Sequence, residues 1–236
     1  MYTSAIFDGS EKVIGHGAQA DVYLYHGFAY KAYRPDYLVE WIEFEKSQQQ
    51  AVNRAGLSAV RYYDTEDPHL LKMDLVSGVE LEERVLQGFV GGFDILASMF
   101  RKVHSAPSAG IDMPRYIHTV GMGMTEAEQA KVIPIVERLT SSMSECICHL
   151  DMHFKNIMIP SDGGEPVIID WINARIAPPV FDYARTYAVF KEFAPEAVAL
   201  YEKAVGADIA ALGISDSDFA DAVTVSTVVR ECERRN

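Results

Sequence analysis

The stretch His149–Trp171 reads HLDMHFKNIMIPSDGGEPVIIDW, and it decides the fold expected for the whole chain. Two short apolar runs flank a Ser-Asp-Gly-Gly-Glu-Pro sequence, a pattern that predicts a β-hairpin. Asp151 and Asn156 lie just before the first strand, and Asp170 ends the second. We therefore expect three oxygen-bearing side chains near one edge of the hairpin, where they could meet a divalent cation and a hydroxyl nucleophile.

The composition limits the kinds of protein that this chain can be. Its 236 residues are enough for one large domain or two lobes with a sizeable core. The net charge of −13 argues against nucleic acid or an anionic membrane as a partner, and it is compatible with a cationic small-molecule substrate. Neither a run of 18 apolar residues nor a basic and apolar leader occurs, so we expect a cytoplasmic protein without a membrane partner.

The cysteines indicate neither a disulfide framework nor a metal site. There are three of them, Cys146, Cys148 and Cys232, and an odd, sparse set is typical of a reducing compartment. Cys146 and Cys148 precede His149, but no second Cys/His pair follows at a zinc-binding distance. We expect them to be small, buried residues that lead into the polar stretch.

The first part of the chain carries a glycine-rich loop between two predicted strands. Small residues alternate with β-branched or aromatic ones, which predicts strands over residues 12–14, 20–25 and 28–33. Gly15 and Gly17 lie between the first two, where a missing Cβ lets backbone amides approach phosphate oxygens. Because the loop joins two strands, it is not a dinucleotide-binding fingerprint, which opens a helix. An ordinary hairpin turn remains the alternative interpretation.

A lysine and a glutamate are expected to pair in the same region. Lys31 stands in the middle of the third strand. A helix expected over residues 35–54 has an apolar face that comprises Leu38, Trp41, Ile42, Ala51 and Val52. Glu45 falls in the middle of that face, and a buried carboxylate is costly without a partner. We therefore expect Glu45 to bind Lys31; a position at the frayed edge of the face is the alternative.

The remaining pattern predicts an α+β fold with two lobes. Strands over 60–63 and 70–73 complete a sheet of five, and residues 74–78 form a linker. We expect residues 1–76 to form a small lobe with an antiparallel five-stranded sheet and one helix. Residues 77–236 would form a larger, mostly helical lobe.

The second lobe shows helical periodicity in several segments. A capping box at Thr125–Glu128 opens one helix, which Pro134 is expected to kink or delay. Residues 110–124 are expected to be a loop. His104 is expected to be a core or capping residue rather than a catalytic one. Further helices are predicted over residues 80–86, 93–104, from 180, 196–203 and 216–233.

Three motifs identify the family that the chain resembles. They are His149-x-Asp151-x-His153-x-x-Asn156, Ile169-Asp170-Trp171 and Asp182-Tyr183-Ala184-Arg185. They resemble the aminoglycoside phosphotransferase and choline kinase group, relatives of protein kinases that phosphorylate small molecules. The resemblance covers roughly residues 13–185. Asp-Trp in place of Asp-Phe-Gly, together with the absence of Ala-Pro-Glu, disfavours a protein kinase.

The resemblance implies an ATP-dependent O-phosphotransferase with a two-lobed, kinase-like fold. Asp151 would face the acceptor hydroxyl, beside His153 and Lys155, whose involvement in transfer stays open. Asn156 and Asp170 would hold Mg²⁺. His149 and Asp182 would support the loop. The phosphates of the nucleotide would meet the glycine loop, with Gly15 and Gly17, and Lys31 paired with Glu45. The adenine would meet the side chain of Met73 and the backbone of Asp74 and Val76.

Two departures from the family pattern leave the acceptor open. Leu150 replaces the usual glycine between His149 and Asp151, which we expect to alter packing only. Only 66 residues follow Asp170, which is short for a group whose C-terminal helices help to build the acceptor pocket. The acceptor could be an aminoglycoside, a choline-like amine, a thiamine-like alcohol or a sugar. A non-catalytic nucleotide-binding regulator and a Ser/Thr protein kinase remain as alternatives.

Overall fold

The N-terminal part of the protein is an antiparallel sheet of five strands. The computed structural model describes residues 6–17 and 19–235. The sheet has the order β1-β2-β3-β5-β4, with bounds Lys12–His16, Ala20–Tyr25, Phe28–Tyr33, Leu70–Asp74 and Tyr62–Tyr63. His26 and Gly27 connect β2 to β3, both with positive φ (47° and 81°), as a tight hairpin turn between right-twisted strands requires. The expected five strands are present, although β4 is shorter than predicted.

Helix α1 (Val39–Arg54) packs against this sheet with most of the expected face, since Ile42, Ala51 and Val52 are buried. Ile42 is buried against Tyr33 and Leu71. Leu38 and Trp41 were expected to be buried as well, and they are 59% and 42% exposed. The buried face also includes Glu45, as expected, together with Gln48 and Gln49, and each of these three residues is at most 2% exposed. The buried face is therefore partly polar: Glu45 binds Lys31, and Gln49 donates hydrogen bonds to Ser58 Oγ and to the carbonyl of Val60.

The bounds of α1 follow from its ends. It begins after Leu38, so the expected start at Pro35 is wrong. It ends at Arg54, where Gly56 has φ 75°, a left-handed conformation that favours glycine and stops the helix.

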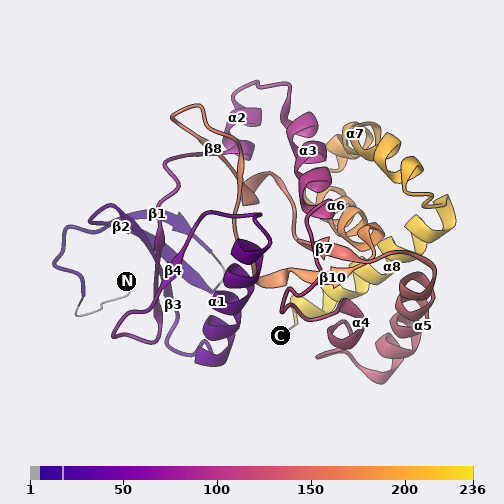
Figure 1. Ribbon diagram of the computed structural model, residues 1–236, viewed down its shortest axis with the longest axis horizontal. Helices are drawn as coiled ribbons and strands as arrows, with labels where there is room; N and C mark the ends of the chain where they lie inside the picture. Colours follow the sequence, from indigo (N-terminus) through magenta and orange to yellow (C-terminus); the bar gives the residue numbers. More distant parts are fainter. Residues whose placement is uncertain (1–5, 18, 236) are drawn as a thin grey trace.

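The C-terminal part is mostly helical, as expected. Figure 1 shows these helices on the side of the molecule opposite the indigo sheet. Helix α6 (Pro179–Phe193) is buried along most of its length and packs against α8 (Asp216–Glu233). The other helices are α2 (Leu81–Leu86), α3 (Gly92–His104), α4 (Tyr116–Thr119), α5 (Glu126–Ser142) and α7 (Val198–Ala211). Helix α4 lies in a segment that was expected to be a loop.

Helix α5 begins where the capping box predicted. Thr125 accepts a hydrogen bond from the backbone N–H of Glu128, and the Glu128 carboxylate accepts one from the backbone N–H of Thr125. Pro134 lies inside the helix and does not delay its start.

Two small sheets hold the polar stretch between the sheet and the helices. The predicted hairpin is present as β8 (Ile157–Pro160) and β9 (Val167–Ile168), and β6 (Gly78–Glu80) adds a third strand. The expected linker is therefore partly a strand. A second pair, β7 (Cys146–Cys148) and β10 (Arg175–Ala177), was not predicted. Within residues 6–17 and 19–235, we find no helix with both the length and the apolar character needed to cross a bilayer.

Candidate active site

The expected ion pair between Lys31 and Glu45 is present. Lys31 Nζ lies 2.8 Å and 3.0 Å from the two carboxylate oxygens of Glu45, and 3.5 Å from Oδ1 of Asp170. The Tyr33 hydroxyl donates a hydrogen bond of 2.6 Å to Glu45, which is 1% exposed. Burial alone would lower the pKa of Lys31, but the carboxylates of Glu45 and Asp170 raise it above its usual range. Lys31 is therefore a cation at neutral pH, held in place by α1.

A cavity of about 460 Å³ lies between the sheet and β8–β9, beside the linker. We refer to it as the linker cavity. The cavity is lined by six of the residues that the sequence analysis singled out, namely Gly15, Lys31, Met73, Asp74, Val76 and Asp170. Gly17 is not among its lining residues. It directly follows β1, where its N–H donates to the carbonyl of Ala20 and an added Cβ would approach that oxygen to 3.0 Å. Gly17 thus serves the tight turn.

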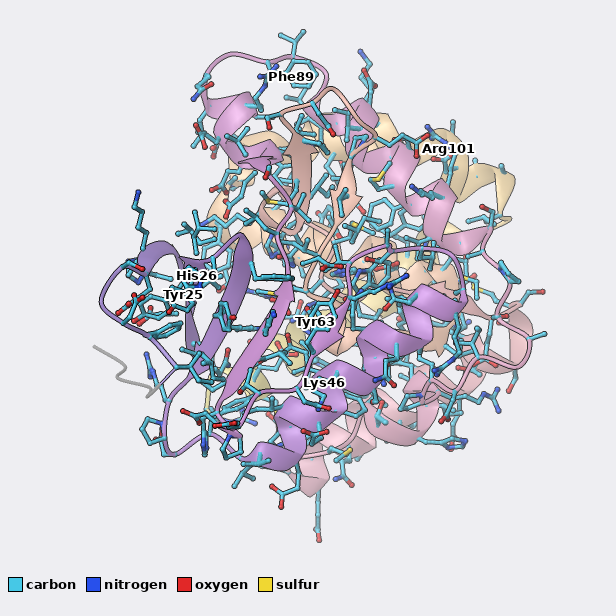
Figure 2. All side chains as sticks on the ribbon, turned by 60° about the vertical axis from the view of Figure 1, so that its left-hand side comes forward. Tyr25, His26, Lys46, Tyr63, Phe89 and Arg101 are labelled. Atoms are coloured by element: carbon cyan, nitrogen blue, oxygen red, sulfur yellow. The ribbon has the colours of Figure 1, made fainter. Side chains whose placement is uncertain are left out.

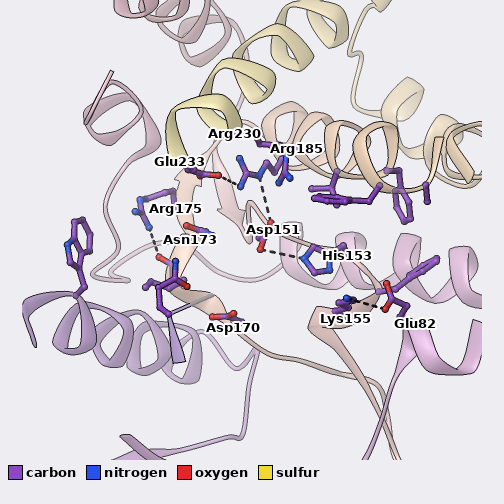
Figure 3. A pocket seen from close by; sticks show the side chains of 18 of the residues that line it. Glu82, Asp151, His153, Lys155, Asp170, Asn173, Arg175, Arg185, Arg230 and Glu233 are labelled. Carbon is purple, nitrogen blue, oxygen red and sulfur yellow. Dashed lines mark hydrogen bonds and ion pairs between the residues drawn. The ribbon is translucent and has the colours of Figure 1, made fainter. Parts of the chain in front are cut away.

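Asp151 lies on the other side of Asp170 in a polar cluster (Figure 3). Asn156 Nδ2 donates hydrogen bonds to its carbonyl (2.8 Å) and its Oδ2 (3.3 Å). His153 Nε2 lies 3.6 Å from Oδ2, and Arg185 Nε lies 3.8 Å from Oδ1. Burial alone would raise the pKa of Asp151, but His153 and Arg185 outweigh it and hold that pKa well below its usual range. Asp151 is therefore an anion at neutral pH.

Asp182 fixes the backbone that carries Asp151. Its buried carboxylate accepts hydrogen bonds from the backbone N–H groups of His149 (3.0 Å) and Leu150 (2.8 Å). His104 Nε2 lies 3.0 Å from the same carboxylate, so His104 is a core residue, one of the two roles expected for it. His149 Nε2 lies 3.0 Å from the carbonyl of Ile169, which ties the loop to the strand before Asp170. The expected supporting positions of His149 and Asp182 are thus present.

Leu150 does more than alter packing. Its φ is 58°, in the left-handed region where the usual glycine has no Cβ penalty. Such a conformation costs a branched residue on the order of 1–2 kcal/mol. The side chain is 7% exposed, so its burial offsets that cost. The expectation that Leu150 changes packing alone is therefore wrong, because the backbone is strained as well.

Asp170 and Asn156 have the chemistry of ligands for a hard divalent cation. Asp170 has φ 61°, which turns it out of the strand, and its side chain is 42% exposed. Asn156 uses Nδ2 for its hydrogen bonds, and its Oδ1 accepts none among the described residues. Asn156 ends a short 3₁₀ turn directly before β8, and Asp170 lies two residues after the end of β9. The backbone N–H of Ile169 donates a hydrogen bond to the carbonyl of Asn156, which joins these two segments. Two oxygen-bearing side chains on adjoining segments fit a hard divalent cation, which shares its coordination shell with water and phosphate oxygens.

A second cavity, of about 660 Å³, opens beside Asp151 and Asp170. It is lined by Arg175, Arg185 and Arg230, and we refer to it as the arginine cavity (Figure 3). A third cavity of about 510 Å³ adjoins it and shares Arg175, Arg185 and Glu233 with it. Asp170 lines both the linker cavity and the arginine cavity. The two spaces therefore meet at the expected metal ligand.

Several residues of the arginine cavity were not expected from the sequence. Arg230 and Glu233 come from the end of α8, and Arg175 comes from β10. Glu233 accepts a hydrogen bond of 2.6 Å from Arg185, the last residue of the third motif. Helix α8 thus brings the short C-terminal region back to the site. No sequence signal marks these residues, because charged residues near a helix end usually face solvent.

Comparison with known proteins agrees with this geometry. Residues 10–213 match the phosphotransferase enzyme family, and the chain therefore belongs to that family. No curated protein sequence matched the chain. An aminoglycoside phosphotransferase from Streptomyces rimosus has a similar structure, with a TM-score of 0.69, 16% identity and coverage of 94% of this chain and 93% of that one.

Two further structures share the architecture. A choline kinase from Streptococcus pneumoniae has a TM-score of 0.65 and 15% identity, over 95% of this chain and 84% of that one. An ethanolamine kinase from Plasmodium vivax has a TM-score of 0.61 and 13% identity, over 97% and 74%. The fold is therefore the expected two-lobed, kinase-like α+β fold, and the protein is a phosphotransferase with an alcohol group as acceptor.

Proposed function

We propose that the protein is an ATP-dependent, Mg²⁺-requiring kinase that phosphorylates a hydroxyl group of a small molecule. One observation carries the proposal. Asp170, in contact with Lys31, lies on the wall between the linker cavity and the cavity that holds Asp151. A phosphate bound at that wall would have a cation on one side and a carboxylate facing an acceptor on the other.

The linker cavity, between an N-terminal lobe of residues 1–76 and the β8–β9 hairpin, is the proposed nucleotide site. The side chain of Met73 and the backbone of Asp74 and Val76 would contact the adenine. Gly15 and Gly17 would let backbone amides approach the phosphates, and Lys31, oriented by Glu45, would bind them. The Streptomyces rimosus phosphotransferase has also been solved in complex with ADP and streptomycin, with a TM-score of 0.67 and 16% identity to this chain.

Residues 77–236 would supply the metal ligands and the catalytic carboxylate. Asn156 and Asp170 would hold Mg²⁺, which neutralises phosphate charge in phosphoryl transfer. Asp151 would accept a hydrogen bond from the acceptor hydroxyl and orient its oxygen toward the γ-phosphorus. As that oxygen bonds to phosphorus and the bond to the ADP oxygen breaks, the hydroxyl proton passes to Asp151. Because the pKa of Asp151 is low, the carboxylate is ionised and ready, and its main contribution is orientation.

His153 and Arg185 would position Asp151. Both contact its carboxylate, from 3.6 Å and 3.8 Å, and both line the arginine cavity. Lys155 lies 3.4 Å from Glu82 and lines the same cavity, so it would lie beside the acceptor.

A two-part experiment tests the proposal. Thermal unfolding would be followed with ATP, with Mg²⁺ and with both, and ADP formation would then be measured with a library of hydroxylated metabolites. We expect stabilisation that requires both ATP and Mg²⁺, and ADP formation that depends on the acceptor. Stabilisation without acceptor-dependent turnover would instead favour a nucleotide-binding regulator. Turnover only with Ser/Thr peptides would favour a protein kinase.

A further inference from the structure

Arg175 is a desolvated cation without a carboxylate partner. It lines both the arginine cavity and the adjoining cavity (Figure 3). Its Nη1 donates to the carbonyls of Ile172 (3.0 Å) and Ala174 (2.7 Å), and its Nε donates to the Thr119 hydroxyl (3.3 Å). Within residues 6–17 and 19–235, no acid lies within ion-pair distance of it, and Nη2 makes no hydrogen bond. Burial lowers the pKa of Arg175 to about 10.

The other charged side chains of the arginine cavity are paired. Lys155 contacts Glu82, Arg185 contacts both Asp151 and Glu233, and Arg230 contacts Glu192. Asp170 lies near Lys31. A buried charge without a partner is costly, so Arg175 stands out as a group that a ligand would complete.

The local charge of this cavity differs from the charge of the whole chain. The protein carries −13, but the cavity is lined by equal numbers of basic and acidic side chains: Lys155, Arg175, Arg185 and Arg230, and Glu82, Asp151, Asp170 and Glu233. Lys155, Arg185 and Arg230 each contact an acid. Arg175 is the basic side chain of this cavity that has no acid partner within the described part of the chain, and an anionic group of the acceptor would supply one.

We propose that the acceptor is a hydroxylated small molecule that also carries an anionic group, a carboxylate or a phosphate, which Arg175 binds. The proposal rests on the proposed phosphotransfer, which it narrows to an anionic substrate class. The planar guanidinium matches both oxyanions, since its donors form a fork. This acceptor class differs from the cationic one with which the net charge is compatible, and the cationic class is the competing interpretation.

The aromatic residues of α1 and the turn before it complete the site. Tyr37 and Trp41 line both cavities, and Phe44 lines the larger one with its ring 5.0 Å from the Arg175 guanidinium carbon. These side chains would cover the carbon frame of the acceptor. A position in the wall of the cavities also explains why Trp41 is exposed, whereas a position in the core would not.

Matched acceptors test the charge preference. ADP formation would be measured with glycerol, glycerate, glycerol 3-phosphate, choline, streptomycin and a library of larger hydroxy acids and sugar phosphates. We expect kcat/KM for the best anionic acceptor to exceed that for its neutral analogue at least tenfold. The glycerate and glycerol 3-phosphate arms, with their larger relatives, distinguish a carboxylate from a phosphate. A cationic or neutral best acceptor would overturn the inference and leave the phosphotransfer intact. No turnover with any acceptor would contradict the phosphotransfer itself.

Variants separate binding from a merely structural role. Arg175→Gln should raise KM for the anionic acceptor about 10- to 100-fold and change kcat less, and Arg175→Lys should restore part of the loss. Arg101→Gln, which removes an arginine from the outer surface of α3 (Figure 2), is the control and should change neither constant. A structural role would weaken anionic and neutral acceptors equally. An unchanged anionic-to-neutral ratio in Arg175→Gln would therefore contradict the assignment.

A second inference comes from a separate cluster behind the catalytic loop. Cys146 Sγ and Cys148 Sγ on β7 lie 3.8 Å apart, and with a ring nitrogen of His104 they form a group whose atoms lie within 4.8 Å of one another. His104 Nδ1 is buried and has no hydrogen-bond partner within the described residues, and the side chain is 9% exposed. Its other nitrogen contacts Asp182, and metal-binding histidines commonly contact a carboxylate through their second ring nitrogen in this way. Tetrahedral zinc with Zn–S bonds of about 2.3 Å separates two sulfurs by about 3.8 Å.

We infer that Cys146, Cys148 and His104 form a site for a thiophilic divalent cation such as Zn²⁺. Binding would release the two thiol protons and form two metal–thiolate bonds and one metal–imidazole bond, with water as the fourth ligand. Asp182 contacts both His104 and the backbone N–H of His149, in the loop that carries Asp151. A single side chain, that of Asp182, therefore connects the site to this loop. The expectation of inert cysteines rested on spacing along the chain, which could not include a histidine from α3.

Cobalt binding tests this site, since Co²⁺ bound by thiolates absorbs in the near ultraviolet and Co²⁺ on oxygen ligands lacks that band. We expect one Co²⁺ per chain with the thiolate band, displaced by Zn²⁺ and lost in Cys146→Ser. Cys232→Ser, at the remaining cysteine, should keep the band. Absence of the band in the wild-type protein, or its loss in Cys232→Ser with retention in Cys146→Ser, would overturn the inference.

Discussion

The linker cavity and the arginine cavity meet at Asp170 but are built in different ways. The linker cavity is lined by six residues that strand patterns and motifs single out in the sequence, among them Lys31, Asp74 and Asp170. The arginine cavity combines α1, β10, the catalytic loop, α6 and the end of α8. The contrast suggests that the phosphate-handling half of the site is fixed by local pattern, whereas acceptor recognition depends on side chains that tertiary packing gathers.

The largest expected effect concerns Asp151. Asp151→Asn keeps the size of the side chain and removes the charge that orients the acceptor, so kcat should fall about 10²- to 10⁴-fold. The measurement is steady-state ADP formation with the best acceptor. The same substitution at Asp162, in the exposed turn between β8 and β9, is the control and should leave kcat unchanged. A fall of less than threefold in Asp151→Asn would contradict the role of Asp151.

The next effect separates stability from function on the linker side. Lys31→Met leaves the buried Glu45 carboxylate without its cation, so the free energy of unfolding should fall by about 3–5 kcal/mol. Adding Glu45→Gln removes the unpaired charge and should recover much of that loss. Urea unfolding measures both. Neither variant should be stabilised by ATP with Mg²⁺ as the wild type is, and a double variant that binds ATP normally would contradict the phosphate role of Lys31.

Two neighbouring residues of α1 sharpen the comparison between core and cavity. Ile42 is 2% exposed, and Ile42→Ala should cost about 2–5 kcal/mol of stability through the cavity it leaves. Trp41→Ala, at a residue that is 42% exposed, should cost far less stability but raise the acceptor KM several-fold. Urea unfolding and acceptor kinetics on both variants test this. The reverse pattern would place Trp41 in the core and contradict its position at the cavity.

The smallest effect is a shift in pH dependence. Because His153 and Arg185 lower the pKa of Asp151, the carboxylate stays ionised as pH falls through the usual range for aspartate. Its protonation should therefore not limit kcat/KM between pH 8 and 5. Arg185→Gln removes the guanidinium, one of the two groups that lower the pKa of Asp151, so the acid limb should move to higher pH. A limb that moves to lower pH, or stays where it is, would show that Arg185 does not act on Asp151.

The parts of the molecule that the sequence predicted share a physical property. The five strands, the Lys31–Glu45 pair and the hairpin before Asp170 depend on local periodicity or on a buried charge that needs a partner. The exposure of Trp41 and the strain at Leu150 depend on how helices and loops pack together. Arg175 and Glu233 became site residues only because β10 and α8 converge beside Asp151. No periodicity within one segment contains that information.

One measurement tests the central claim most directly, namely that the two cavities form a single phosphotransfer site. The wild-type protein and Asp151→Asn would be incubated with ATP labelled at the γ-phosphate, Mg²⁺ and the best acceptor, and the label would be traced. We predict that the wild type moves the label into the small-molecule acceptor and that Asp151→Asn does so at least 100-fold more slowly. Label that stays in ATP, or appears only as inorganic phosphate or on protein, would contradict the account.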